Sequence, residues 1–222
     1  MTGVLLLLLF LARTPAERAL DTQDRPKLEK IAGESTMVAD NQPTDPKAQY
    51  QSALHNSLLA QLAIEVSDKN LGRAAAEAGI RAGQRAVKLK PGSAEYHRIL
   101  GTLCGQIIPA NVMAGLKYGR CAMEEVAKAI ELDGKSSKAW MSRGVGNYYL
   151  PAAFGGGVNL AIDDLNKAVQ LDPANAEAHL WLGVALRKAG RNADARKAIA
   201  RSLELNPERK WAKQQLEKTP AQ

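Results

Sequence analysis

Nearly the same phrase occurs four times in this chain of 222 residues. It reads AVKLKP from Ala86, AIELDG from Ala129, AVQLDP from Ala168 and SLELNP from Ser202. Its Pro or Gly stands at positions 91, 134, 173 and 207, which gives intervals of 43, 39 and 34 residues. A phrase that recurs at such spacing is typical of a stack of similar structural units. Because Pro and Gly continue a helix only at a cost, we expect each phrase to end one helix and precede the next.

The composition favours helices that pack closely through small side chains. Hydrophobic residues make up 45% of the chain, aromatic residues only 5%, and Ala is abundant. This balance is typical of an all-α protein and not of a β-sandwich. The formal net charge is +7, but the Lys and Arg residues are interleaved with Glu and Asp. A solvated helix surface explains this pattern better than a nucleic-acid groove does, so we expect no nucleic-acid partner.

The N-terminus carries an apolar run from Val4 to Ala12, followed by Arg13. The run is too short to span a bilayer but fits the central region of a signal peptide. Small residues before Glu17 predict a signal peptide over residues 1–16 and export, to a bacterial periplasm. No Lys or Arg precedes the run, so the segment could instead remain as an uncleaved membrane anchor. It is the only membrane contact that the sequence suggests.

The region over residues 17–48 is polar and contains Pro26, Pro43 and Pro46. Such a composition predicts a linker with little core-forming content. We therefore expect the folded domain to cover residues 49–218 and a short tail to cover residues 219–222.

Residues 176–209 resemble a tetratricopeptide repeat without insertions. Gly183, Gly190, Ala195 and Pro207 stand at the spacing of that family. The resemblance implies that Gly183 and Ala195 let two helices approach closely, that Gly190 makes the turn between them, and that Pro207 separates this pair from the next element.

Three further stretches resemble the same repeat less strongly. Residues 137–175 carry five extra residues in LPAAFGGG, residues 93–136 carry nine around IIPANVMAG, and residues 49–92 form a degenerate unit. Residues 210–218 are expected to form a terminal capping helix. The resemblance thus predicts an all-α, short right-handed solenoid of about four antiparallel helix pairs.

The stretch HRILGTLCGQI over residues 97–107, followed by an insertion and EEVAKAIELD, resembles the tetratricopeptide-like domain of the regulator of microtubule dynamics family. That family also lengthens its helix pairs. The resemblance implies a domain relationship only and no role at microtubules.

No pattern in the chain indicates catalysis, a metal or a cofactor. The motifs of serine hydrolases, zinc peptidases, nucleotide-binding loops and dithiol redox sites are missing from the sequence. The histidines are His55, His97 and His179; the last two share one position of the repeat, where a packed histidine is expected and not a metal ligand. Acidic pairs such as Asp163–Asp164 are expected to lie in first turns of helices and to complement the helix dipole.

The resemblance implies that five positions in the first helix of each pair face a concave groove. An apolar and aromatic centre with a basic rim suits capture of a peptide or a partner helix. The predicted partner-binding residues are Arg98, Lys138, Met141, Val145, Tyr148, Tyr149, Leu180, Val184 and Arg187. The sequence leaves a second reading open for the two tyrosines, which is packing against the inserted loop.

These observations predict a non-catalytic protein-interaction scaffold whose partner is a protein or peptide of unknown identity. The alternative is a small-ligand-binding protein or an accessory subunit of a solute transporter, which needs an enclosed pocket near Tyr148 and Phe154.

The chain has two cysteines, Cys104 and Cys121. In an antiparallel hairpin that turns near residues 109–113 they lie at about the same height. They either form a disulfide, which an oxidising compartment permits, or remain reduced as small core residues. The sequence leaves both possibilities open.

Overall fold

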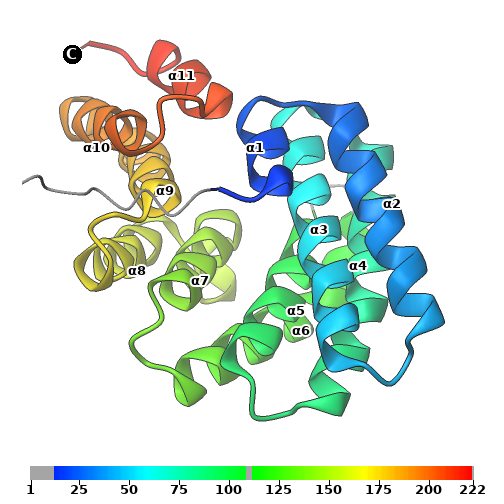
Figure 1. Cartoon of the computed structure of the whole chain (residues 1–222). Helices are drawn as coiled ribbons and strands as arrows, with labels where there is room; N and C mark the ends of the chain where they lie inside the picture. The colour runs from blue at the N-terminus through cyan, green and yellow to red at the C-terminus, as the bar shows by residue number, and fades with distance from the viewer. Residues whose placement is uncertain (1–12, 109–111, 222) are drawn as a thin grey trace, which may run out of the picture.

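The computed structural model describes residues 13–108 and 112–221 (Figure 1). Helices joined by turns make up this part of the chain, and it contains no strand. In chain order the helices are α1 (Pro15–Asp21), α2 (Arg25–Asn41), α3 (Pro46–Glu65), α4 (Lys69–Leu89), α5 (Ala94–Gln106), α6 (Val112–Leu132), α7 (Ser137–Tyr149), the short 3-10 helix η2 (Ala152–Phe154), α8 (Val158–Leu171), α9 (Ala176–Lys188), α10 (Asn192–Leu205) and α11 (Lys210–Glu217).

Eight of these helices form four consecutive pairs, and the closest packing in the molecule lies within the pairs. The first pair is α3–α4, the second α5–α6, the third α7–α8 and the fourth α9–α10 (Figure 1). Helix α11 follows the fourth pair as a cap. The predicted all-α solenoid of four helix pairs with a C-terminal capping helix is therefore confirmed.

The recurring phrase is the end of the second helix of each pair. Helices α4, α6, α8 and α10 end at Leu89, Leu132, Leu171 and Leu205, one residue before the cap that precedes the Pro or Gly. In all four pairs the backbone N–H of the residue after this Leu donates to the carbonyl four residues earlier, at 2.8 to 3.0 Å. Each phrase thus ends a helix, as the sequence predicts.

Short polar side chains start the helices. Asp45, Asp68, Ser136 and Asn175 each accept a hydrogen bond from a backbone N–H in the first turn that follows. Such caps satisfy donors that have no partner within the helix. The local sequence therefore determines where these helices begin, as it determines where the preceding helices end.

Glycines occupy one equivalent place in the first helices of the second, third and fourth pairs. An added Cβ at Gly101, Gly144 or Gly183 would lie 2.7, 2.7 or 2.4 Å from a side-chain atom of the second helix. Atoms cannot approach so closely, so a side chain at these positions would push the two helices apart.

The extra residues of the earlier repeats extend helices as well as loops. Helices α4 and α6 each have 21 residues, whereas α8 and α10 each have 14. The insertion in the third pair instead forms the connection over residues 150–157, which includes η2.

The predicted linker over residues 17–48 is wrong, because α2 and most of α1 lie there. Of the three prolines that suggested a linker, Pro43 lies in the turn between α2 and α3, whereas Pro26 and Pro46 stand in the first turns of these two helices. A proline is tolerated at this position because its missing N–H would have no partner there. Leu28 and Ala32 of α2, one helical turn apart, are buried.

The predicted signal peptide falls mainly on residues 1–12, which lie outside the described residues. Its expected end does not: Ala16 is a buried residue of α1. Among the helices of the described chain, none combines the length and the apolar character that crossing a membrane requires.

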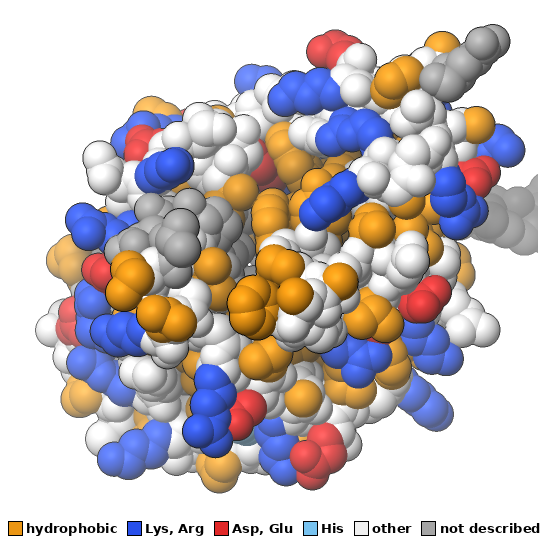
Figure 2. All heavy atoms as spheres, turned by 180° about the vertical axis from the view of Figure 1, so that it is seen from behind, with side chains coloured by type: hydrophobic (Ala, Val, Ile, Leu, Met, Phe, Trp, Pro, Cys, Tyr) orange, Lys and Arg blue, Asp and Glu red, His pale blue; other side chains and the backbone are white. Residues whose placement is uncertain are grey.

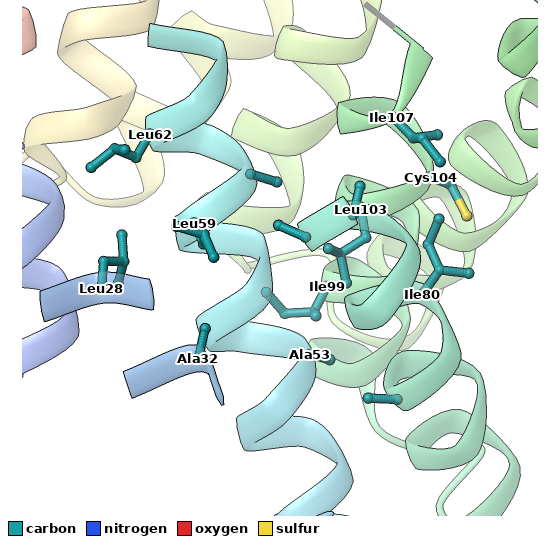
Figure 3. Packing of buried hydrophobic residues seen from close by; sticks show 14 of the residues in the cluster. Leu28, Ala32, Ala53, Leu59, Leu62, Ile80, Ile99, Leu103, Cys104 and Ile107 are labelled. Atoms are coloured by element: carbon teal, nitrogen blue, oxygen red, sulfur yellow. The ribbon is translucent and has the colours of Figure 1, made fainter. Parts of the chain in front are cut away.

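The buried hydrophobic residues form two clusters. The first includes residues of α1 to α6, among them Leu28, Leu62, Ile99 and Leu103 (Figure 3). The second joins α8 to α11 and has Trp181 among its members. The third pair lies between the two halves, and α7 packs against both α5 and α9.

Candidate functional site

An aromatic cluster forms where the last two pairs meet α11. It consists of Tyr148 and Tyr149 at the end of α7, Trp181 in α9 and Trp211 in α11. The ring centroids of Tyr148 and Tyr149 lie 5.9 and 6.1 Å from that of Trp181, and the centroids of Trp181 and Trp211 lie 5.0 Å apart. These separations are typical of favourable aromatic contacts.

The members of the aromatic cluster differ in exposure. Trp181 and Trp211 are buried, Tyr148 is half-buried, and Tyr149 is 48% exposed. Partial removal of Tyr149 from solvent raises the pKa of its phenol to about 12, and electrostatic repulsion from Tyr148 and from Glu65 on α3 adds smaller upward shifts. Burial also raises the pKa of Tyr148, and Arg187 opposes that shift. Both phenols are therefore neutral at pH 7, and Tyr149 is the member that solvent reaches.

Two lysines border the predicted groove and are exposed, Lys138 in α7 and Lys188 at the end of α9. The Lys188 ammonium lies 4.2 Å from the ring centroid of Tyr148 and donates to the Tyr148 carbonyl at 2.8 Å. A cation over the ring face is attracted by the ring electrons. Positive charge therefore borders the aromatic cluster.

The structure brings the apolar part of the predicted groove together but buries some of it. Met141, Val145 and Tyr148 are partly buried and pack against the second core cluster. Leu180 and Val184 belong to that core, with exposed fractions of 0% and 3%. The expectation that these two residues face an open groove is wrong, because the fourth pair and the elements around it close over them.

Arg98 and Arg187 are also engaged within the protein. Arg98 is 7% exposed and donates from Nε and Nη2 to both carboxylate oxygens of Glu95, at 2.7 and 2.6 Å. Burial alone would raise the pKa of Glu95, but the ion pair holds it below its ordinary value. Arg187 donates to Gln215 and to Thr219 at the end of the chain. Both arginines therefore have partners within the protein, and of the two only Arg187 is partly exposed.

A buried ionic cluster joins the two ends of the solenoid, and sequence reasoning missed it. Arg209, in the turn before α11, is fully buried and donates to Glu65 of α3 and to Glu177 of α9, the latter at 2.6 Å. Asp21 of α1 lies 3.8 Å from the same guanidinium and accepts from Asn206 at 2.9 Å. No local pattern marks these residues, because they come from four distant parts of the chain.

Burial and pairing compete in the ionic cluster. Burial raises the pKa values of Glu65 and Asp21 above their ordinary values, although the nearby guanidinium groups of Arg209 and Arg13 oppose the shift. Burial would lower the pKa of Arg209, but Glu177 and Glu65 outweigh it and raise that pKa. Such a buried cluster is stable only while each charged group is paired with a group of opposite charge.

The histidines take structural roles. The Nε2 atoms of His97 and His179 lie 2.8 and 3.0 Å from the carbonyls of Pro91 and Pro173, six residues earlier. Trp140, at the same position of the third pair, donates its indole N–H to Gly134 at 2.9 Å, also six residues earlier. At this position of the repeat, the imidazole of His97 or His179 thus makes the hydrogen bond that the indole N–H of Trp140 makes in the third pair.

His97 also contacts Glu125 of α6 at 2.6 Å through Nδ1. In the described chain no group of three or more histidine, cysteine and acidic residues could hold a metal ion.

The expectation for the acidic pairs is wrong. Asp164 lies in the second turn of α8 and is buried, where it accepts from Arg143 at 2.6 and 2.9 Å and from Asn147 at 2.9 Å. It fastens α7 to α8 and does not complement a helix dipole.

Cys104 in α5 and Cys121 in α6 are joined by a disulfide, with their Cα atoms 5.9 Å apart. Both cysteines pack with the first core cluster. The bond fastens the two helices of the second pair near their connection.

Comparisons with known proteins agree with this architecture. Residues 155–190 match the model of the TPR repeat and residues 176–209 match the model of the tetratricopeptide repeat. Among solved structures, TTC0263, a thermophilic TPR protein of Thermus thermophilus, has a TM-score of 0.64 at 16% identity, over 92% of this chain and 96% of that chain.

The HusA haemophore of Porphyromonas gingivalis has a TM-score of 0.58 at 18% identity, over 78% of this chain and 92% of that chain. No curated protein matches the chain. The resemblance of residues 97–107 to the regulator of microtubule dynamics family stays a prediction. The family models identify tetratricopeptide repeats over residues 155–209, and the described chain as a whole has the solenoid fold of such repeats.

Proposed function

We propose that the protein is an exported interaction scaffold that binds a segment of a partner protein over the aromatic cluster at α7, α9 and α11. Tetratricopeptide repeats generally mediate contacts between proteins, so a scaffold role follows from the fold. The position of the binding surface and the export are the proposal.

The observation that carries the proposal is the exposure of Tyr149 on a rigid aromatic base. Trp181 and Trp211 hold the cluster from below, while Tyr149 remains 48% exposed. Aromatic residues fixed in this way are enriched among those that dominate binding energy, because they lose little side-chain entropy on binding.

The partner segment is expected to carry negative charge beside an apolar anchor. Lys188 is exposed and lies over the Tyr148 ring, while Glu177 is held by Arg209. The whole chain carries a formal net charge of +7. On the face opposite to that of Figure 1, hydrophobic side chains gather at the centre with Lys and Arg side chains around them (Figure 2). A positive surface speeds association with an acidic partner at low ionic strength.

A photo-crosslinking residue at position 149 in the native envelope fraction would identify the partner. The crosslinked partner segment, made as a peptide, is then titrated against Tyr149→Ala and Phe154→Ala. Phe154 is 73% exposed but outside the aromatic cluster, so it is the matched control. Tyr149→Ala is expected to weaken binding by about 2 kcal/mol, roughly 30-fold, and Phe154→Ala to leave it unchanged. Equal affinities of the two variants would place the binding surface elsewhere.

Met141→Asp and Tyr148→Ala are expected to abolish binding as well, but both residues also support the fold. Each packs against the second core cluster, and Tyr148 holds Lys188 over its ring. Circular dichroism must therefore show unchanged helix content before a lost affinity is assigned to the surface.

Binding of a small ligand is the second candidate, because the chain is similar in fold to a haemophore. The two best-defined hollows of the described chain lie elsewhere: one of about 320 Å³ is lined by residues of α2, α3 and α4, and neither is lined by Tyr148 or Phe154. This placement favours the peptide. Titration with haemin, followed by its visible absorption band, distinguishes the two, since a saturating one-to-one change that Tyr149→Ala removes would favour the ligand.

The proposed export rests on the apolar run before Arg13 and is supported by the Cys104–Cys121 disulfide, a bond typical of oxidising compartments. Intact-mass measurement of the native protein from the envelope fraction is expected to show that residues 1–16 are absent. A full-length mass in a cytosolic fraction would contradict export.

A further inference from the structure

Arg209 connects elements that a simple stack of repeats keeps apart. In a solenoid each unit contacts its neighbours, so the first and fourth pairs should be separated by the two pairs between them. Here one guanidinium donates to Glu65, the last residue of α3 in the first pair, and to Glu177, near the start of α9 in the fourth. Gln61 of α3 also donates to Glu177, at 3.2 Å. The two ends of the stack therefore meet.

Residues 17–23, which form most of α1 and the turn after it, lie across this meeting point (Figure 1). On one side Ala19 and Leu20 are buried in the first core cluster. On the other side Asp21 accepts from Asn206 at 2.9 Å, and Gln23 exchanges hydrogen bonds with Gln214 of α11 at 3.2 and 3.4 Å. One short segment thus binds both ends through different surfaces.

The segment combines a very short helix with a turn of unusual backbone conformation. Gln23 has φ +52°, in the left-handed region that residues other than glycine rarely adopt. Local hydrogen bonds fix this turn, from the Gln23 N–H to the Leu20 carbonyl at 3.0 Å and from the Asp24 N–H to the Ala19 carbonyl at 2.7 Å. The Gln23 side chain also bonds to Gln214 and Glu65. Helix α1 has seven residues, too few for a helix that is stable in isolation.

The contact between the two ends of the solenoid depends on the balance of charge in the ionic cluster. Three carboxylates, those of Asp21, Glu65 and Glu177, face Arg209, and one more guanidinium, that of Arg13, pairs with Asp21 at 2.9 Å. Loss of a guanidinium leaves buried carboxylates without compensation, which favours their return to water. Cleavage after Ala16 would remove Arg13 in this way.

We propose that residues 17–23 form a strap that closes the solenoid by joining its first and fourth helix pairs, and that the two ends separate when the strap is released. The strap is expected to be less stable than the helix pairs, because it combines a very short helix with a net negative buried cluster. Its release widens the concave side without unfolding the pairs. The inference concerns the distance between the ends and does not depend on which partner binds.

Spin labels at Lys30→Cys in α2 and Lys213→Cys in α11 measure that distance in the full chain. The Lys30 side chain is 75% exposed, Lys213 is exposed, and the native cysteines are bonded to each other. The variants are Arg209→Gln, which removes the central charge, and Asn206→Asp, which places a carboxylate against Asp21. Arg201→Gln is the control: it is the same substitution in an exposed ion pair of α10.

The doubly labelled parent and the Arg201→Gln control are expected to give one short distance by pulsed electron spin resonance. Arg209→Gln and Asn206→Asp are expected to add a population at longer distance. Amide hydrogen exchange over residues 17–23 is expected to accelerate about a hundredfold, while exchange in α5 and α6 stays unchanged. An unchanged distance in either variant overturns the proposal. Equal acceleration in α1, α5 and α6 also overturns it, since the cluster would then support the whole fold and not a strap.

Discussion

The close approach of helices in the last repeat gives a test of how the solenoid is packed. In Gly183→Ala the new Cβ would lie 2.4 Å from Cγ1 of Ile199 and 2.9 Å from the carbonyl oxygen of Ala195. Both partners belong to α10, and Ile199 is fully buried. A side chain could rotate away, but a backbone carbonyl cannot, so α9 and α10 must separate.

Two contributions of opposite sign set the magnitude. Replacing Gly by Ala within a helix stabilises it by about 1 kcal/mol, because Ala loses less backbone entropy on folding. Overpacking a well-filled interface costs about 1–3 kcal/mol, and a backbone contact places this case near the upper limit. The variant is therefore expected to lose about 2 kcal/mol of folding free energy, a fall in Tm of about 4–8 °C for a chain of this size.

Gly146 provides the matched control. It lies in α7, is exposed, and an added Cβ would meet no atom within 4 Å. Gly146→Ala carries only the gain in helix propensity, so it is expected to stabilise the protein by about 1 kcal/mol and raise Tm by about 2–4 °C.

Thermal and urea denaturation followed by circular dichroism at 222 nm measure both variants. The same substitution is thus expected to change stability in opposite directions at two helical positions. A Gly183→Ala protein as stable as the parent would refute the close packing of α9 on α10. A destabilised Gly146→Ala protein would show that exposure and open space around a helical glycine do not decide whether alanine there raises or lowers the stability.

Two further predictions concern the cysteines and the half-buried His55. The Cys104–Cys121 disulfide spans a sequence separation of 17 and is expected to contribute about 3 kcal/mol to the free energy of unfolding on the chain-entropy model. Reductant should therefore lower Tm, and protein unfolded without reductant should show no free thiol. Two reactive thiols per chain would contradict the disulfide. Burial lowers the pKa of His55, so below about pH 6.5 the unfolded chain binds a proton that the folded chain does not, and stability falls as pH drops through that value. His55→Gln lacks this contribution and is expected to lose less stability between pH 7.5 and pH 5.5 in urea denaturation, whereas equal losses in variant and parent would contradict the argument.

The periodic features of this fold can be predicted from the sequence because they depend on neighbouring residues. The stop at Pro173 and the cap at Asn175 act within one turn of helix, so local chemistry decides where α8 ends and α9 begins. The close contact at Gly183 follows from the spacing of one repeat. The same local signals stand at Pro26 and Pro46, where the polarity of residues 17–48 predicts a linker but the prolines begin helices.

The candidate site was predicted only in part, for the opposite reason. Spacing within a helix places Met141, Val145 and Tyr148 on one face, and the structure keeps them together. It does not reveal which residues the fourth pair covers, so Leu180 was expected on an open surface although it is fully buried. Burial depends on the curvature of the whole stack, which small rotations between pairs determine.

What the sequence by itself determined is the unit: four helix pairs, their turns and the small residues at which the helices meet. What only the tertiary structure decided is the closure of those units on one another. Arg209 lies 144 residues from Glu65 and 32 from Glu177 in the chain, and its pairing with them follows from no pattern in either neighbourhood. The physical reason is that helix formation and capping are local, whereas the position of a buried charge depends on every pair of helices stacked between the ends.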